Sequence, residues 1–229
     1  MISMNRMDLF SIPIYKMEFE DHGKYKDQWV EYISQPEICK DATRRSTLKF
    51  THPNLHKEEM FLPFTNFASE CLNTVMGDLG FEPHIQMTGL WGTIQEEGGY
   101  HHRHTHGNSF LAGVYYLEGN SNNSGTTFIN PLKEHRQIIP RRKTGKSLRI
   151  LNQFDTKFEE GVLYIFPAWL EHQTNVNKMA VTGSVRKILS FNSMPVGKTN
   201  NDPFDRYNYP DTNNLDMVRG LNELYDYKG

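Results

Sequence analysis

The order of local patterns along the chain is the feature that most constrains its fold. Before residue 84, apolar residues repeat with helical spacing, first at Tyr25, Trp29 and Ile33 and then in a broad stripe that ends at Gly80. After residue 84, the chain changes to short runs rich in β-branched and aromatic residues, divided by Gly, Asn and Pro. Helices followed by strands predict an antiparallel sheet or barrel with helices packed on one side, not alternating β/α units.

Five runs carry the strand signal and predict a mainly β protein. They read IQMTGLWGTIQ, SFLAGVYYLE, GTTFINP, GVLYIFPA and RKILSFNSM. Together they predict a jelly-roll-like core over residues 85–195. We expect one domain over residues 1–229, with a helical flank over 1–84 and a polar, Pro-interrupted tail over 196–229. Residues 132–160 contain the basic stretch KEHRQIIPRRKTGK and predict a long insert between strands.

Charge and composition exclude several classes of protein. The 25 Lys and Arg residues nearly balance the 27 Asp and Glu residues, so no nucleic-acid or membrane-surface partner is expected. The sequence has no run of eighteen apolar residues and no apolar run of signal length, which predicts a cytoplasmic protein. Cys39 and Cys71 lie in segments with helical patterns and predict buried thiols. A homodimer through the N-terminal helices or the tail is a hypothesis with no motif behind it.

Histidines cluster directly before the strand-like run SFLAGVYYLE. Four of the ten histidines lie within six positions, from His101 to His106. Side chains two apart on a strand point to the same side, so His104 with His106, or His102 with His104, could direct two imidazoles at one cation. His172 follows the apolar run GVLYIFPA and offers a third imidazole. The pattern predicts a metal site, and the alternative is a basic surface loop with unrelated histidines.

Several segments, taken in order, resemble a known family. Over about residues 9–195, the chain resembles the 2-oxoglutarate/iron(II) oxygenases, a family in the superfamily that includes prolyl hydroxylases. The segments that carry the resemblance are LFSIPIYK, WGTIQEEGGYHHRHTHGNSFLAGVYYLE, GTTFINP, GVLYIFPAWLEH and VRKILSFN. The resemblance implies a double-stranded β-helix of the cupin-like kind, with Fe(II) and 2-oxoglutarate as cofactors. It also implies that the first metal ligands come from a His-x-Asp or His-x-His at a strand start and the last from a distal histidine. These positions fall on His104, His106 and His172.

The same resemblance implies a basic residue, here Arg186, that holds the far carboxylate of 2-oxoglutarate. A guanidinium binds a carboxylate bidentately and keeps its charge, which suits this role. The two-residue period of a strand places Ser190 on the same face, where it can donate a second hydrogen bond, and turns Lys187 outward. Tyr116 resembles a tyrosine that helps to hold this carboxylate in some prolyl hydroxylases. Packing inside the barrel is the alternative for Tyr116.

The sequence thus predicts an Fe(II)- and 2-oxoglutarate-dependent dioxygenase. It would hydroxylate an unidentified small-molecule or amino-acid substrate with O2 and release succinate and CO2. His106 stands where the usual triad of two histidines and one carboxylate has its Asp, so His106 is a ligand, a neighbour of the ligands or a bystander. Glu96 or Glu97 could supply a carboxylate instead. Two other functions stay open: a three-histidine cupin-type iron oxygenase without 2-oxoglutarate, and a non-catalytic metal-binding β-barrel module.

Overall fold

The computed structural model describes residues 10–42, 47–82, 84–120, 124–133, 151–177, 185–198 and 208–209. Its helices are α1 (His22–Ile33) and α2 (Leu62–Asp78), with short 3-10 turns η1 (Leu55–Lys57) and η2 (Glu59–Phe61). Its strands are β1 (Tyr15–Glu18), β2 (Cys39–Asp41), β3 (Leu48–Thr51), β4 (Ile85–Gln95), β5 (Leu111–Glu118), β6 (Ser124–Ile129), β7 (Gln153–Lys157), β8 (Val162–Pro167), β9 (His172–Thr174), β10 (Arg186–Pro195), β11 (Gly197–Lys198) and β12 (Asn208–Tyr209).

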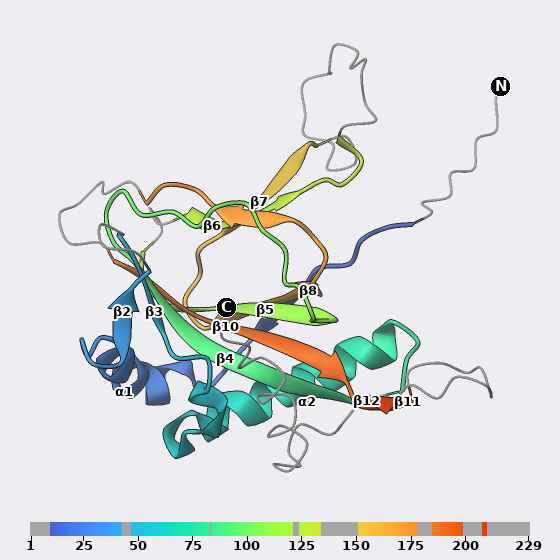
Figure 1. Ribbon diagram of the computed structural model, residues 1–229, viewed down its shortest axis with the longest axis horizontal. Coiled ribbons are helices and arrows are strands. Elements are labelled where there is room, and N and C mark those ends of the chain that lie inside the picture. The colour runs from blue at the N-terminus through green and yellow to red at the C-terminus, as the bar shows by residue number, and fades with distance from the viewer. Residues whose placement is uncertain are drawn as a thin grey trace, which may run out of the picture.

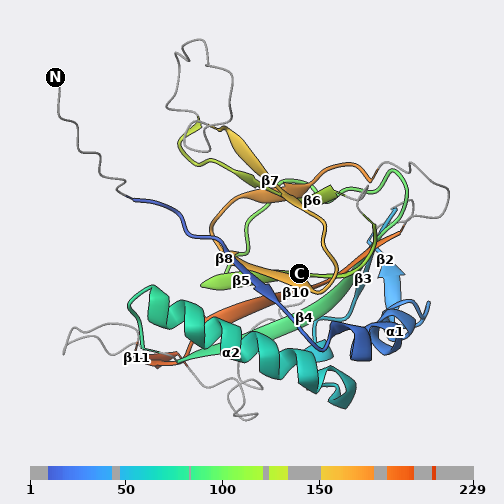
Figure 2. The same ribbon diagram turned by 180° about the vertical axis from the view of Figure 1, so that it is seen from behind.

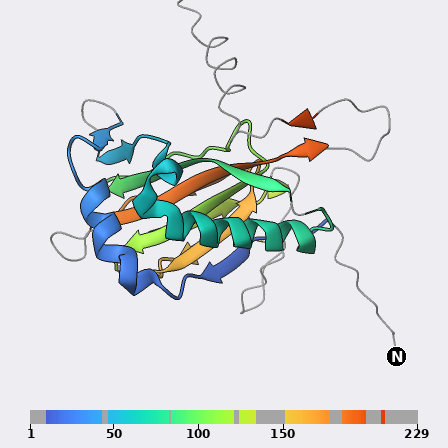
Figure 3. The same ribbon diagram turned by 90° about the horizontal axis from the view of Figure 1, so that it is seen from below.

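Two antiparallel sheets face each other in the described part of the chain (Figure 1). The larger sheet has the strand order β1-β8-β5-β10-β4-β3-β2, and the smaller sheet has the order β7-β6-β9. Both helices lie across the outer face of the larger sheet (Figures 2 and 3). This arrangement confirms the predicted mainly β fold with N-terminal helices on one side. Among the described residues, no helix is long and apolar enough to cross a membrane.

The helices form where the apolar spacing predicted them. In α1, Trp29 is buried and stacks on Tyr25, with ring centroids 5.3 Å apart. In α2, Gly80 at φ +81° ends the helix, and the N–H of Phe81 donates to the carbonyl of Met76 at 2.9 Å. This is the Schellman pattern, in which glycine adopts the left-handed conformation at low cost. The two 3-10 turns η1 and η2 precede α2 along the chain.

Strand alternation divides the buried side chains between two cores. Tyr115 on β5 and Leu189 on β10 pack with the helices, whereas the adjacent Tyr116 and Ile188 pack in a second core with β8. Successive side chains of a strand point to opposite faces, so one strand serves both cores. The larger sheet is therefore covered on both sides, and the second core separates it from the smaller sheet that carries β9.

Two details differ from the sequence predictions. The insert predicted over residues 132–160 contains β7, which pairs with β6, while residues 134–150 of that stretch lie outside the described residues. Because β7 is an edge strand with four exposed residues in five, it lacks the apolar alternation that reveals a strand. Cys39 begins β2 and is not helical, since α1 ends at Ile33. Cys39 and Cys71 are buried free thiols, as predicted.

Gly113→Ala is expected to destabilise the protein by about 1–3 kcal/mol, because it would overpack the core. Gly113 pairs with Phe191 across β5 and β10, and an added Cβ would overlap the Phe191 ring. The matched control is Gly23→Ala in α1, where an added Cβ meets no heavy atom within 4 Å. That control should leave stability unchanged or raise it by up to about 1 kcal/mol. Urea unfolding of both variants measures the difference, and equal stabilities would contradict the prediction.

Candidate metal site

The candidate site lies at the edge of the smaller sheet, where the histidine run pairs with β9. His104 and His172 form an antiparallel bridge in which the N–H of each donates to the carbonyl of the other, at 2.9 and 3.0 Å. The N–H of His106 donates to the carbonyl of Ala168 at 2.9 Å, in the turn before β9. Bridged residues of antiparallel strands point to the same side. The pairing therefore brings histidines from distant parts of the sequence together.

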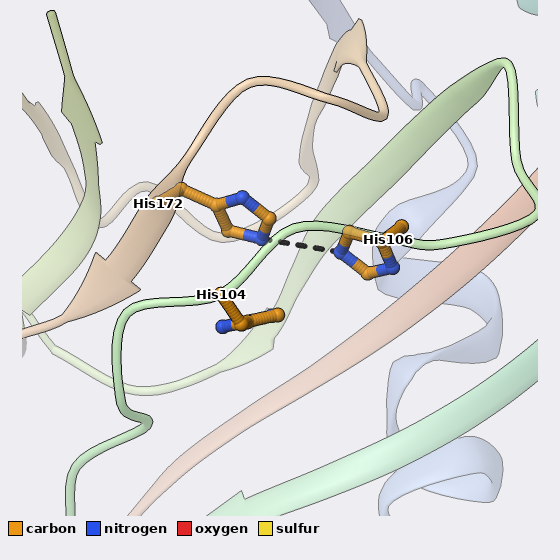
Figure 4. Close-up of side chains that lie close together, drawn as sticks. All are labelled: His104, His106 and His172. Carbon is orange, nitrogen blue, oxygen red and sulfur yellow. Dashed lines mark hydrogen bonds between the residues drawn. The ribbon is translucent and has the colours of Figure 1, made fainter. Parts of the chain in front are cut away.

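The imidazoles of His104, His106 and His172 converge. One ring nitrogen of each lies within 4.8 Å of the corresponding nitrogens of the other two. Nε2 of His106 and Nε2 of His172 are 3.1 Å apart, and a dashed line joins the two atoms in Figure 4. Two imidazole nitrogens at right angles on a metal about 2.1 Å away would be about 3.0 Å apart. The observed spacing therefore fits two ligands of one metal ion.

Backbone carbonyls hold the remaining nitrogens of two of these rings. Nδ1 of His104 lies 2.7 Å from the carbonyl oxygen of His102, and Nδ1 of His172 lies 2.9 Å from that of Leu170. A carbonyl can only accept, so we assign the proton to each Nδ1 and a lone pair to each Nε2. Metal-binding histidines commonly have this second hydrogen bond, because it fixes the tautomer and the ring orientation.

Burial keeps the rings neutral. Desolvation, with repulsion from His104, lowers the pKa of His172 to about 3 and the pKa of His106 to about 4. Desolvation also lowers the pKa of His104. All three rings are therefore neutral at pH 7, which is the form that binds a metal ion. The donor set fits a transition metal, and three ligands leave further coordination positions open.

The other candidate ligands lie apart from this group. Among the described residues, the three histidines form the group of His, Cys, Asp and Glu side chains that could hold a metal, and no carboxylate joins it. Glu96 is ion-paired with Lys49 at 2.6 Å, and Glu97 is exposed. His102 is exposed as well. Of the alternatives left by the sequence, the geometry favours the set of three histidines.

A buried cation lines the same cavity as the histidines. Arg186 begins β10 and is 1% exposed. Ile188 and Ser190 also line the cavity, as the two-residue period predicts. Lys187 instead forms an ion pair with Glu118 at 2.6 Å. Arg186 and Ser190 therefore lie around the same cavity as His104, His106 and His172.

The surroundings of the Arg186 guanidinium suit a negatively charged ligand. The guanidinium lies 5.5 Å from the ring centroid of Tyr116 and 5.8 Å from that of Phe158. Its Nη1 donates to Oε1 of Gln95 at 3.2 Å. Burial lowers the pKa of Arg186, although an arginine stays charged in proteins. A carboxylate that entered the cavity would meet this buried guanidinium, whose planar fork of N–H donors can bind a carboxylate bidentately.

Gln95 connects this cation to the segments that carry the histidines. Its Nε2 donates to the carbonyl of Gly99 at 2.6 Å and to the carbonyl of Asn175 at 3.1 Å. Because both amide protons point at carbonyls, the amide oxygen must face Arg186. Gln95 therefore links β10 to the histidine run and to the loop after β9.

Tyr116 lies at the edge of the site without lining the cavity. It is fully buried, and its hydroxyl oxygen lies 3.1 Å from Oγ1 of Thr126 and 2.7 Å from Oγ1 of Thr156. The hydroxyl thus links β5 to the smaller sheet, and the ring contacts Arg186. This geometry favours the packing interpretation of Tyr116.

Sequence reasoning missed two residues of the site, Gln95 and His101. The signal for Gln95 was a glutamine at the end of a strand-like run, eleven residues long, that leads directly to the histidine run. His101 belongs to the recognised histidine run, but regular alternation from His104 would turn His102 inward. The structure instead lines the cavity with His101. An irregular pairing of this kind cannot be read from spacing alone.

Solved structures with the same fold include enzymes that use 2-oxoglutarate. The non-heme α-ketoglutarate-dependent epimerase SnoN from nogalamycin biosynthesis has a TM-score of 0.60 and 9% identity, over 81% of this chain and 80% of that chain. HygX from Streptomyces hygroscopicus, with nickel and 2-oxoglutarate bound, has a TM-score of 0.56 and 10% identity, over 80% and 83%. A Pseudomonas putida prolyl-4-hydroxylase has a TM-score of 0.55 and 13% identity, over 81% and 95%. At such low sequence identity, these structural matches show the fold alone, and they confirm the predicted jelly roll.

A family comparison covers the site directly. Residues 89–192 match the model of the family described as "Putative 2OG-Fe(II) oxygenase". This segment contains the histidine group and Arg186. The segment that carries the site is therefore similar to a 2OG-Fe(II) oxygenase domain, and this match indicates an enzyme of the 2-oxoglutarate-dependent oxygenase class. A search of curated proteins finds no match.

Proposed function

We propose that this enzyme is an Fe(II)- and 2-oxoglutarate-dependent dioxygenase that hydroxylates a small-molecule or amino-acid substrate. His104, His106 and His172 would bind the iron, and Arg186 with Ser190 would bind the far carboxylate of 2-oxoglutarate. One observation carries the proposal: three neutral, convergent imidazoles and one buried guanidinium line a single cavity. One small molecule could therefore bind the metal with one end and Arg186 with a carboxylate at the other end.

Each part of the chain would have a distinct task. The chemistry that iron(II) and 2-oxoglutarate supply when bound is the oxidation of a C–H bond by O2, with succinate and CO2 as co-products. The backbone bridge between His104 and His172 presets the ligand positions. Arg186 orients the co-substrate, and Gln95 orients Arg186. Phe166 packs edge-on against His172, with ring centroids 4.7 Å apart, and helps to keep water from the site.

The third histidine changes the charge of the proposed site. In the usual facial triad, a carboxylate offsets one of the two charges of iron(II). A histidine at position 106 leaves the bound metal more positive by one charge. An anionic co-substrate then becomes the main source of compensation, in addition to its attraction to Arg186. The proposal therefore predicts that metal and 2-oxoglutarate strengthen each other's binding.

Anaerobic visible absorption tests the proposed function. Metal-free protein is titrated with iron(II) and then with 2-oxoglutarate, and a weak charge-transfer band is expected after both are present. Succinate formation under air is the second readout. If iron binds and the keto acid produces no band, the 2-oxoglutarate assignment is wrong. If no iron binds, a non-catalytic module is the better description of the site.

A second candidate function is a cupin-type iron oxygenase that needs no 2-oxoglutarate. The observation in its favour is the set of three histidines without a carboxylate among the described residues. In that case Arg186 would bind the substrate directly. The same titration separates the two candidates, because this enzyme would bind iron(II) and consume O2 without producing succinate.

Location, assembly and domain organisation rest on the sequence. We propose a cytoplasmic enzyme formed by one domain over residues 1–229. The homodimer stays a prediction, which analytical ultracentrifugation would test. Limited proteolysis would test the single domain, since a separable flank would yield a stable fragment that contains residues 85–195.

A further inference from the structure

His101, the first residue of the histidine run, lines the site but has no role in the proposed metal binding. His101 is half-buried and lines the cavity together with the three metal-binding histidines and Arg186. Its ring nitrogens do not belong to the group that lies within 4.8 Å. His101 therefore adjoins the proposed metal centre without being one of its ligands.

The backbone of His101 is fixed by the strand that carries His172. The N–H of His101 donates to Oγ1 of Thr174 at 2.7 Å, and the N–H of Thr174 donates to the carbonyl of His101 at 3.1 Å. The bridge between His104 and His172 would pair His102 with Thr174 in a regular ladder. The chain instead pairs His101 with Thr174, which leaves His102 exposed.

Two contacts hold the His101 ring. It stacks on the ring of His104, with centroids 4.0 Å apart and planes inclined by 29°. The ring of Phe50 meets it edge-on, with centroids 5.6 Å apart. Repulsion from His104, His106 and Arg186 contributes, after burial, to lowering the pKa of His101, so the ring lies within electrostatic reach of both the ligands and the cation.

His101 and Arg186 line the same cavity as the three histidines, so a molecule that bridges the metal and Arg186 would occupy a space that His101 also lines. We propose that His101 is a binding residue for 2-oxoglutarate, with a ring N–H that donates to an oxygen of the co-substrate beside the metal. This inference rests on the proposed function. An imidazole offers a rigid donor, and the carboxylate and keto oxygens of 2-oxoglutarate are acceptors. The irregular pairing with Thr174 would serve to bring this donor inward.

Calorimetry on protein loaded with Zn(II), which supports no turnover, tests the inference. His101→Phe keeps a ring that can stack on His104 but removes the donor, whereas His101→Gln keeps a donor and loses the stacked ring. We expect the Kd for 2-oxoglutarate to rise about tenfold in His101→Phe, the loss of one hydrogen bond to a charged group. His101→Gln should keep most of the affinity. Zn(II) binding without 2-oxoglutarate should stay close to wild type in both variants.

His102→Ala is the matched control, since it removes the adjacent, exposed histidine and should leave both affinities unchanged. If His101→Phe binds 2-oxoglutarate like wild type, or if its only defect is in Zn(II) affinity, His101 merely supports His104 and the inference is overturned. If wild-type protein binds Zn(II) but no 2-oxoglutarate, the proposed function itself fails and the inference fails with it. Thermal unfolding of each variant identifies a folding defect, and the second variant then decides the result.

Discussion

Replacing His172 with alanine is expected to lower the affinity for iron(II) by more than about 100-fold, since loss of residues that only support a ligand already costs 10- to 100-fold. His172 is the most buried of the three histidines, at 3% exposed, and its Nε2 lies 3.1 Å from Nε2 of His106. Two imidazoles would remain, and the alanine cavity would offer no donor in their place. Anaerobic competition with a coloured chelator measures the affinity directly.

His102→Ala is the control for this prediction. It removes another histidine of the same run, and it keeps the backbone carbonyl that holds Nδ1 of His104. We expect wild-type affinity for iron(II). A large loss in His102→Ala, combined with little loss in His106→Ala, would show that His102 is the second local ligand. Wild-type affinity for iron(II) in His172→Ala would show that the proposed metal centre is wrong.

The sequence predicted the four central strands of the larger sheet, β4, β5, β8 and β10, because their side chains follow a clear pattern. In β10, Arg186, Ile188 and Ser190 alternate with Lys187 and Leu189, and the structure puts the first three around one cavity. Successive side chains of a strand point to opposite faces, which leaves a two-residue period that is visible without any knowledge of neighbours. An edge strand such as β7 is mostly exposed and shows no such apolar period, so residues 153–157 looked like part of a loop.

The metal site was predictable for a related reason. Histidines are rare enough that His104 and His106, directly before an apolar strand, stand out, and a resemblance pointed to His172. Their convergence, however, depends on the bridge between residues 104 and 172, which joins segments 68 positions apart. Spacing along one strand could not decide between His102 and His106, because the chain leaves the regular ladder at His101 and Thr174.

Interactions that depend on three-dimensional pairing were beyond sequence reasoning. Gln95 contacts Arg186 because β4 and β10 pair in a register that sets the two residues opposite each other. The Tyr116 hydroxyl faces Thr126 and Thr156 because β5 lies under the smaller sheet at that point. In both cases the residue type was visible, and its partner was not. Side-chain roles at a site therefore need the register as well as the motif.

Arg186→Met is expected to weaken the binding of 2-oxoglutarate by at least about 30-fold, since the loss of a buried, charged partner costs roughly 2–5 kcal/mol. Methionine keeps much of the length and apolar volume of the side chain but offers no guanidinium fork. Iron(II) or Zn(II) affinity should be unchanged, because Arg186 is not among the grouped ligands. Calorimetry on the Zn(II)-loaded protein gives both values. Wild-type affinity for 2-oxoglutarate in this variant would exclude Arg186 as the anchor.

Stability distinguishes an anchor from a structural arginine in the same variant. Arg186 is a fully buried cation whose guanidinium contacts an amide and two aromatic rings. Methionine keeps much of the apolar volume of this buried side chain, so for an anchor we expect the unfolding midpoint of Arg186→Met without 2-oxoglutarate to stay close to that of wild type. The control Lys187→Met removes the adjacent cation and its ion pair with Glu118, and should not change co-substrate affinity. A structural arginine would lose stability on replacement, whereas an anchor loses affinity alone.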